Sequence, residues 1–298
     1  MRRYRLHKKR SLFRARAFNI FCFLFVALGI SITSFYFTNK DFATELRQVR
    51  QPKPNVFYIG IDISQTIRPD VLADFKDALI LRLKKFIGEK EVYYHISVFG
   101  LPGCGEEAFA EIVSARSPED PVSFTQKVEK RIREISIARR AEGGEDRTPL
   151  TTPLLCFLEK ALTETVGGRV IIFSDLVNDD SGCQKKYPFP LKAIERFGSQ
   201  KEGQIIFLYP TPFTAGKYDT PDVRERLIKR QRNFMVEMQR LSMKGGVRAF
   251  FYHIPIYSEK RSNFLRSQLQ NSIPATVFEI IWERVSKMVD TIIGAVRG

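Results

Sequence analysis

The sequence lacks several features that would assign it to a familiar enzyme class. It contains no G-x-x-x-x-G-K-[ST] phosphate loop, no internal repeat and no low-complexity tract. Only three histidines and four cysteines occur among its 298 residues. No candidate nucleophile has a base beside it in the pattern that covalent catalysis requires. These absences disfavour a P-loop nucleotide-binding protein and an enzyme that works through a covalent intermediate.

Acidic residues are missing from the first forty positions, which hold nine of the 48 lysines and arginines. The rest of the chain carries 39 basic and 33 acidic residues, so most of the net charge of +15 is local. We interpret the basic arm, residues 1–16, as a segment that contacts lipid headgroups and sets orientation. Nucleic acid is not expected as a partner, because the remaining excess of basic residues is small.

An uncharged run, AFNIFCFLFVALGISITSFYF, follows this arm at residues 17–37. A helix of that length, at about 1.5 Å per residue, spans a hydrocarbon core of roughly 30 Å. The run has no small-x-small cleavage site, which favours an uncleaved transmembrane helix over a cleaved signal peptide or a buried helix. With the basic arm inside, the sequence predicts a single-pass protein of the cytoplasmic (inner) membrane. Its C-terminal domain is then expected in the periplasm or outside the cell.

After a polar linker with two prolines at 38–54, strand-like and helix-like segments alternate. The strand-like segments are 55–61, 91–100, 107–115, 168–175, 203–210 and 247–257. The helix-like segments are 68–88, 123–140, 153–166, 190–198, 220–246 and 276–297. Such alternation predicts βαβ crossovers. We therefore expect one α/β domain at 55–298, a doubly wound and mainly parallel central sheet of about six strands, one of them an antiparallel edge, with helices on both faces.

Three cysteines fall within this domain. Cys156 lies on the apolar face of a predicted helix and is expected to be a small core residue. Cys104 and Cys183 lie in loops that follow strands, and an exported domain can keep a disulfide. These two cysteines are therefore the natural pair.

Oxygen-bearing side chains follow two of the predicted strands. Asp62 ends the first strand and is followed by Ser64 and Thr66, while Asp175 ends the strand at 168–175. In open α/β sheets the functional crevice lies beyond the carboxyl ends of the strands. Carboxylates and hydroxyls without histidine or cysteine suit Mg²⁺, and less well Mn²⁺ or Ca²⁺. The structural alternatives are that the two hydroxyls cap the next helix and that Asp175 caps a turn.

The loop before the helix at 153–166 offers one more hydroxyl ligand. Thr148, Thr151 and Thr152 all lie in or next to it. Thr152 also suits the N-cap of that helix, with Pro153 in the first turn.

Taken together, these residues resemble the metal-ion-dependent adhesion site of the von Willebrand factor A domain family. That site has D-x-S-x-S after the first strand, a threonine in a later loop and an aspartate at the end of the fourth strand. Here the first part reads DISQT at residues 62–66, with Thr66 in place of the last serine. Thr148 matches the loop threonine best, and Asp175 matches the final aspartate. The resemblance covers about residues 54 to 298.

The resemblance implies a protein-binding module rather than an enzyme. Its predicted ligands for Mg²⁺ (or Mn²⁺ or Ca²⁺) are Asp62, Ser64, Thr66, Thr148 and Asp175. The ion would capture an Asp or Glu of a partner protein. One alternative is a metal-free scaffold in an envelope assembly. Another is a Mg²⁺-dependent phosphatase-like enzyme, since DISQT distantly resembles the D-x-D-x-T start of haloacid-dehalogenase-type phosphatases, although Ser64 replaces the required acid.

Overall fold

The computed structural model describes residues 55–138, 151–165, 168–199, 203–214, 219–244, 246–273 and 285. The chain divides into two units, Met1–Lys53 and Pro54–Gly298, and every described residue belongs to the second. The predicted arm, membrane span and linker therefore lie outside the described residues, as does Thr148. Of the helix predicted at 276–297, only residue 285 is described. The predicted domain boundaries stay predictions.

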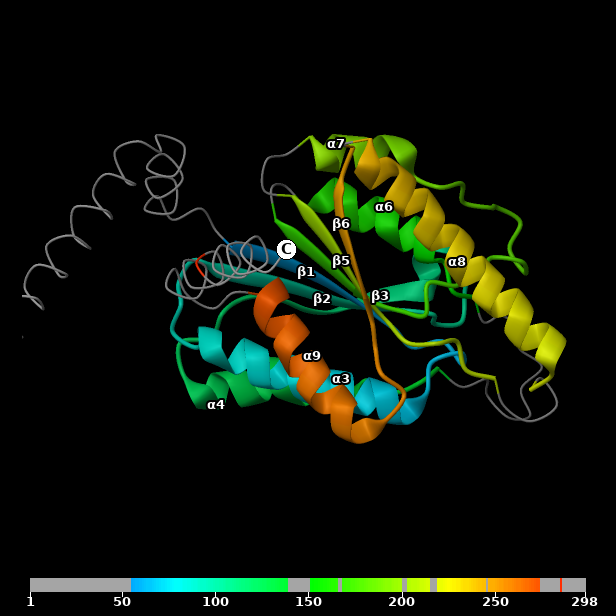
Figure 1. The fold of residues 1–298 in the computed structure, drawn as a ribbon. Helices are drawn as coiled ribbons and strands as arrows, with labels where there is room; N and C mark the ends of the chain where they lie inside the picture. The colour runs from blue at the N-terminus through cyan, green and yellow to red at the C-terminus, as the bar shows by residue number, and fades with distance from the viewer. Residues whose placement is uncertain are drawn as a thin grey trace, which may run out of the picture. The chain divides into compact units, whose positions relative to one another are not determined.

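Within the described residues, six strands form one sheet in the order β3-β2-β1-β4-β5-β6 (Figure 1). The strands are β1 (Asn55–Asp62), β2 (Val92–Phe99), β3 (Phe109–Arg116), β4 (Arg169–Phe173), β5 (Gln204–Tyr209) and β6 (Arg248–His253). All neighbouring strands pair in parallel except β2 and β3, which are antiparallel. The predicted mainly parallel sheet with an antiparallel edge is confirmed. The strand order reverses between β1 and β4, so the two strands that end at predicted ligands are neighbours.

Helices cover both faces of this sheet (Figure 1). They are α3 (Pro69–Leu83), α4 (Pro121–Phe124), α5 (Lys130–Glu134), α6 (Leu154–Glu164), α7 (Leu191–Gly198), α8 (Pro221–Met243) and α9 (Ser258–Ser272). Helices α3, α4, α5 and α9 lie on one face, and α6, α7 and α8 on the other. Each face has its own apolar core. Gly60 of β1 lets the ring of Phe157 lie directly on the strand, because a Cβ there would fall 2.3 Å from a ring carbon.

Two helical segments differ from the prediction. The helix expected at 123–140 is broken by a π turn, Thr125–Glu129, and ends at Glu134. Residues 135–138 continue without helix, and the Ala138 N–H donates to the Ile63 carbonyl over 2.8 Å. Helix α9 was not expected, because its sequence is largely polar. The side chain of Arg261, only 2% exposed, secures it through ion pairs with Asp70 and Asp74 of α3.

The predicted membrane localisation is contradicted. In the part of the chain that the structure describes, no helix combines the length and the apolar surface that crossing a membrane requires. Helix α8 has 23 residues, but charged side chains occur along its whole length. The predicted span at 17–37 lies outside the described residues. The assignment to a single-pass inner-membrane protein is therefore withdrawn.

Candidate metal centre

The carboxyl ends of β1 and β4 bring four of the predicted ligands together. Asp62 is the last residue of β1, and Asp175 lies two residues beyond β4. Both carboxylates are fully buried, with 0% of either residue exposed. Ser64 is also buried and Thr66 is half-buried. Because parallel strands end at one edge of a sheet, the sheet itself brings these residues together.

The Asp62 carboxylate is fixed by two donors, one in the loop after β1 and one directly after β4. The Ser64 N–H donates to Oδ1 over 2.8 Å, and the Ser174 hydroxyl donates to Oδ2 over 2.7 Å. Each carboxylate oxygen has two lone-pair positions. One hydrogen bond per oxygen therefore holds the group in place and leaves it able to accept a further ligand.

The Asp175 carboxylate is less well satisfied. Its Oδ1 accepts the Val177 N–H over 3.0 Å, whereas Oδ2 is buried without a hydrogen-bond partner among the described residues. A buried carboxylate oxygen without a donor costs free energy. The next residue, Leu176, has a φ of 63°, which is rare for a side chain of its size. An unsatisfied oxygen beside a strained backbone position is typical of a functional site.

Both carboxyl groups hold protons more tightly than usual. Burial raises the pKa of Asp62 to about 6, although hydrogen bonds from Ser174 and Ser64 lower it. Burial and the negative charge of Asp62 raise the pKa of Asp175 to about 7, against a lowering by the Thr66 hydroxyl and the Val177 N–H. The edge of the sheet therefore holds two carboxylates that repel each other and lack a nearby counter-charge strong enough to offset burial.

The hydroxyls of Ser64 and Thr66 face each other, 3.0 Å apart. They do not cap the next helix: the N-cap position of α3 is Arg68, and no side chain caps it. The capping alternative is therefore wrong. The Thr66 hydroxyl also lowers the pKa of Asp175, so it lies near that carboxylate as well as near Ser64.

The candidate loop threonines are only partly described. Thr151 is buried and donates its hydroxyl to the Gly103 carbonyl over 2.7 Å. Thr152 pairs through its backbone with Asp179. It is not the N-cap of α6, because Pro153 occupies that position and Asn178 Oδ1 accepts the Leu155 N–H over 3.0 Å. The predicted ligand Thr148 lies outside the described residues and stays a prediction.

Three residues that the sequence did not single out complete the surroundings of the centre. Ser174 holds Asp62, as described above. Gly100 has a φ of +97°, and a Cβ there would fall 2.9 Å from the Ser64 nitrogen and 3.4 Å from Asp62 Oδ1. Gln231 of α8 donates its side-chain amide to the carbonyls of Asp175 and Pro210, over 2.7 and 2.9 Å. A glycine at the end of a predicted strand was the one signal that could have indicated any of them.

A disulfide joins two loops at the same edge. Cys104 follows β2 and Cys183 follows β4, and their Cα atoms are 5.7 Å apart. The predicted pairing is confirmed. Cys156 is buried in α6, as expected. The disulfide joins the loops after β2 and β4, and the Thr151 hydroxyl links the loop before α6 to the first of these through the Gly103 carbonyl.

The donor set determines which ion fits. Among the described residues, no group of three or more His, Cys, Asp or Glu side chains could hold a metal. An ion here would depend on two carboxylates completed by hydroxyls, which are hard oxygen donors suited to Mg²⁺. The orphaned Asp175 Oδ2 supplies a free lone pair for it. The residues present therefore fit a divalent cation.

Comparison with known proteins gives only distant structural matches. A scan of protein-family models finds no match, and neither does a search of curated proteins. Solved structures with some similarity include the pilus adhesin SpaC from Lactobacillus rhamnosus GG in its open conformation, with 11% identity and a TM-score of 0.44 over 74% of this chain and 30% of that one. A von Willebrand factor type A structure from Catenulispora acidiphila has 12% identity and a TM-score of 0.42, over 74% and 43%.

The PilB minor pilin from Streptococcus sanguinis has 8% identity and a TM-score of 0.37, over 74% of this chain and 61% of that one. The chain thus spans less than two thirds of each of these proteins. Similarity at this level assigns neither a family nor a function to the chain.

Proposed function

We propose that the chain is a protein-binding module of the von Willebrand factor A type that works through a divalent cation. Its ligands would be Asp62, Ser64, Thr66 and Asp175, together with Thr148. The observation that carries the proposal is the buried Asp175 Oδ2, which has no partner among the described residues and lies beside a second buried carboxylate. A divalent cation satisfies that oxygen and removes the repulsion between the two acids.

The charge of the site suggests what the ion does. Two carboxylates neutralise a divalent ion without leaving excess negative charge, and the hydroxyls add ligands but no charge. The ion therefore keeps its affinity for another carboxylate. When bound it would act as a bridge to an Asp or Glu side chain on a partner protein. Mg²⁺ is the preferred ion, with Mn²⁺ and Ca²⁺ as alternatives.

The positions of the acids support this family over the alternatives. Asp62 ends the first strand and Asp175 follows the fourth, in the order that the resemblance implies. A phosphatase of the haloacid-dehalogenase type would need a second acid two residues after Asp62, where this chain has Ser64. A metal-free scaffold offers no reason for the unpartnered oxygen of Asp175. Cation-dependent binding accounts for both carboxylates.

The test is a Mg²⁺ titration of the full chain, followed by calorimetry and by thermal unfolding at pH 8. A ligand at about one hundred times its Kd adds roughly 2.7 kcal/mol to the free energy of unfolding, enough to raise the Tm by about 5 °C or more. We expect this rise in the native chain and its loss in Asp175→Asn. Asp120→Asn is the matched control, because Asp120 is an acid that caps α4. The proposal is wrong if Mg²⁺, Mn²⁺ and Ca²⁺ all leave the Tm unchanged.

A carboxylate probe tests the second half of the proposal. Acetyl-Gly-Asp-Gly-amide should bind the Mg²⁺-loaded chain, and neither EDTA-treated protein nor the Asp175→Asn variant should bind it. The matching peptide with Asn in place of Asp isolates the carboxylate. Equal binding of the two peptides would exclude capture of an acidic group by the ion.

A further inference from the structure

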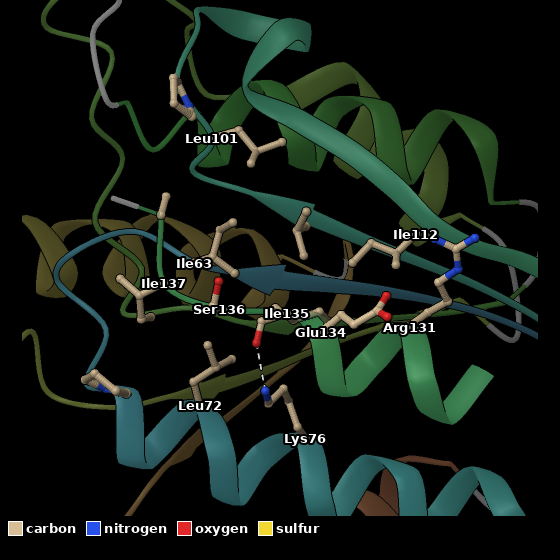
Figure 2. A pocket seen from close by; sticks show the side chains of 14 residues that line it. Ile63, Leu72, Lys76, Leu101, Ile112, Arg131, Glu134, Ile135, Ser136 and Ile137 are labelled. Atoms are coloured by element: carbon tan, nitrogen blue, oxygen red, sulfur yellow. Dashed lines mark hydrogen bonds between the residues drawn. The ribbon is translucent and has the colours of Figure 1, made fainter. Parts of the chain in front are cut away.

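A groove of about 780 Å³ lies beside the candidate metal centre (Figure 2). It is bounded by α3, by residues 131–138 and by side chains from β2, from β3 and from the loops that follow β1 and β2. Its walls are mainly aliphatic: Ile63, Leu72, Leu101, Ile112, Ile135 and Ile137. None of the described side chains that line it is aromatic. The shape and chemistry suit an aliphatic side chain better than a flat ring or a sugar.

The groove and the metal centre share one piece of backbone. Ile63 lines the groove, while its two neighbours in sequence, Asp62 and Ser64, belong to the centre. The Ile63 N–H donates to the Phe99 carbonyl over 2.9 Å, and its carbonyl accepts the Ala138 N–H over 2.8 Å. The wall of the groove is therefore fixed to the loop that carries the ligands.

A second connection runs through the loop after β2. Gly100 packs against Ser64 and Asp62, and the next residue, Leu101, lines the groove. Both N–H groups donate to the Ala108 carbonyl, over 2.9 and 3.0 Å. A molecule bound at the cation could thus reach the groove with the side chain next to its carboxylate.

The polar groups at the groove favour a negatively charged ligand. Arg131 is exposed there, and no ion pair involves it among the described residues. Lys76 donates to the carbonyls of Arg133 and Ile135 and forms no ion pair with a carboxylate within the described residues. Helix α3 begins at Pro69, on the lining, and its N-terminus adds positive potential. Among the described lining residues, Glu134 is the single acid.

From this continuity and charge we propose that the groove receives an aliphatic side chain of the partner segment whose acidic side chain binds the cation. The partner is then an extended stretch of protein in which Asp or Glu stands next to Leu, Ile or Val. The inference rests on the proposed cation-dependent function and adds the chemistry of its partner. The carboxylate supplies the bond to the ion, and the aliphatic neighbour supplies apolar burial and selects among acidic sequences.

Two synthetic peptides test this pairing on the full chain in Mg²⁺. Acetyl-Leu-Asp-Leu-amide and acetyl-Gly-Asp-Gly-amide present the same carboxylate with and without aliphatic neighbours. Partial burial of one leucine side chain predicts about fivefold tighter binding of the leucine peptide. Isoleucine-methyl NMR locates the binding site of the leucine peptide. The signals of Ile63, Ile112 and Ile137 should shift when this peptide is added. The signals of Ile194 and Ile205, in the core on the other face of the sheet, should not.

Substitutions separate groove binding from a general apolar effect. Ile137→Ser and Leu101→Ser alter half-buried side chains of the groove, so each should remove the preference for the leucine peptide and leave Mg²⁺ binding intact. Ile228→Ser is the control, because Ile228 is 38% exposed on α8. If Ile137→Ser fails to fold, Leu101→Ser still decides the question.

The outcomes distinguish this inference from the function on which it rests. If Mg²⁺ binds and both peptides bind equally, the groove proposal is wrong while the proposed function stands. If Mg²⁺ binds and neither peptide does, the groove proposal and carboxylate capture are both wrong while the metal centre stands. If Mg²⁺ itself does not bind, both fail. If the groove methyl signals shift with protein concentration before any peptide is added, a second copy of the chain occupies the groove, and the proposed partner is wrong.

Discussion

Ser174 donates its hydroxyl to Asp62, joining the ends of two neighbouring strands across 112 positions of sequence. The Leu176 N–H in turn donates to the same hydroxyl over 3.0 Å. Ser174 therefore links the strained backbone after β4 to the carboxylate at the end of β1. It also lowers the pKa of Asp62, against the larger effect of burial. One serine thus helps to keep a buried carboxylate ionised and correctly placed.

Replacing this serine should weaken both the fold and the centre. Ser174→Ala leaves Asp62 Oδ2 and the Leu176 N–H without their partner, which predicts a loss of about 1–3 kcal/mol in the free energy of unfolding. Mg²⁺ affinity should fall as well, because Asp62 then loses one of its two fixed donors. Urea denaturation and calorimetry measure the two effects. Ser123→Ala is the control, since Ser123 makes a similar but exposed bond to Asp120. An equal loss in both variants would contradict the special role of Ser174.

The raised pKa values predict an unusual dependence of stability on pH. Asp62 and Asp175 have pKa values of about 6 and about 7 in the folded chain, against an ordinary value of 3.8. Between about pH 4 and pH 7 the folded state binds more protons than the unfolded state, so stability falls as pH rises. The decrease should be a few kcal/mol, because one pKa unit corresponds to about 1.4 kcal/mol. Urea denaturation at several pH values in EDTA measures it.

The variant Asp62→Asn tests the same repulsion between buried carboxylates by removing one of them. It removes one of the two buried charges while keeping an oxygen for the Ser64 N–H. We expect the metal-free variant to be more stable than the native chain at pH 8 by about 1–2 kcal/mol, with a flatter pH dependence. Mg²⁺ should stabilise the native chain and not the variant. A variant that is less stable at pH 8 would show that Asp62 serves the fold more than a cation.

The placement of the two acids was predictable, because it follows from the sheet. Apolar runs at 55–61 and 168–175 indicated buried parallel strands, whose carboxyl ends had to meet at one edge. The pairing of Cys104 with Cys183 followed from the same geometry, since both cysteines lie in loops after strands. These features follow from the order of strands and helices along the chain, which local hydrophobic patterns indicate.

The remaining details depend on contacts between distant segments. Helix α9 has a polar sequence, and the buried Arg261 that secures it binds acids about 190 positions away in α3. Thr152 looked like an N-cap, but Asn178 of another loop supplies the bond to α6. In the sequence Gly100 looks like an ordinary turn residue, and only the folded chain brings it against the Ser64 nitrogen. No local pattern encodes such pairs, because each partner is defined only once the chain is folded.

Substitution of Gly100 tests whether this glycine shapes the metal centre, and Gly88 provides the matched control. Gly100→Ala places a Cβ 2.9 Å from the Ser64 nitrogen and keeps a residue at a φ of +97°. Gly88 has a φ of +86°, but a Cβ there would meet only the Glu119 carbonyl, at 3.9 Å. Both alanine variants lose about 1 kcal/mol of stability from the left-handed backbone conformation. Gly100→Ala also displaces the loop that carries Ser64. We expect Gly100→Ala alone to lower Mg²⁺ affinity, by about tenfold or more. Equal affinities in the two variants would mean that Gly100 does not shape the centre.

The disulfide should stabilise the fold and the centre together. Cys104 and Cys183 are separated by 79 positions, and closing a loop of that length contributes about 4.5 kcal/mol in the chain-entropy model, less any strain. The paired variant Cys104→Ala/Cys183→Ala should therefore lose about 2–4 kcal/mol in the free energy of unfolding. Urea denaturation measures this loss as a lower midpoint concentration. Its Mg²⁺ affinity, measured where it is fully folded, should also fall because the loops after β2 and β4 are no longer joined. Phe86→Leu is the control: Phe86 lies in the core before β2 begins, so this variant should lose stability and keep its Mg²⁺ affinity. If the cysteine variant loses only stability, the disulfide supports the fold and has no part in placing the ligands.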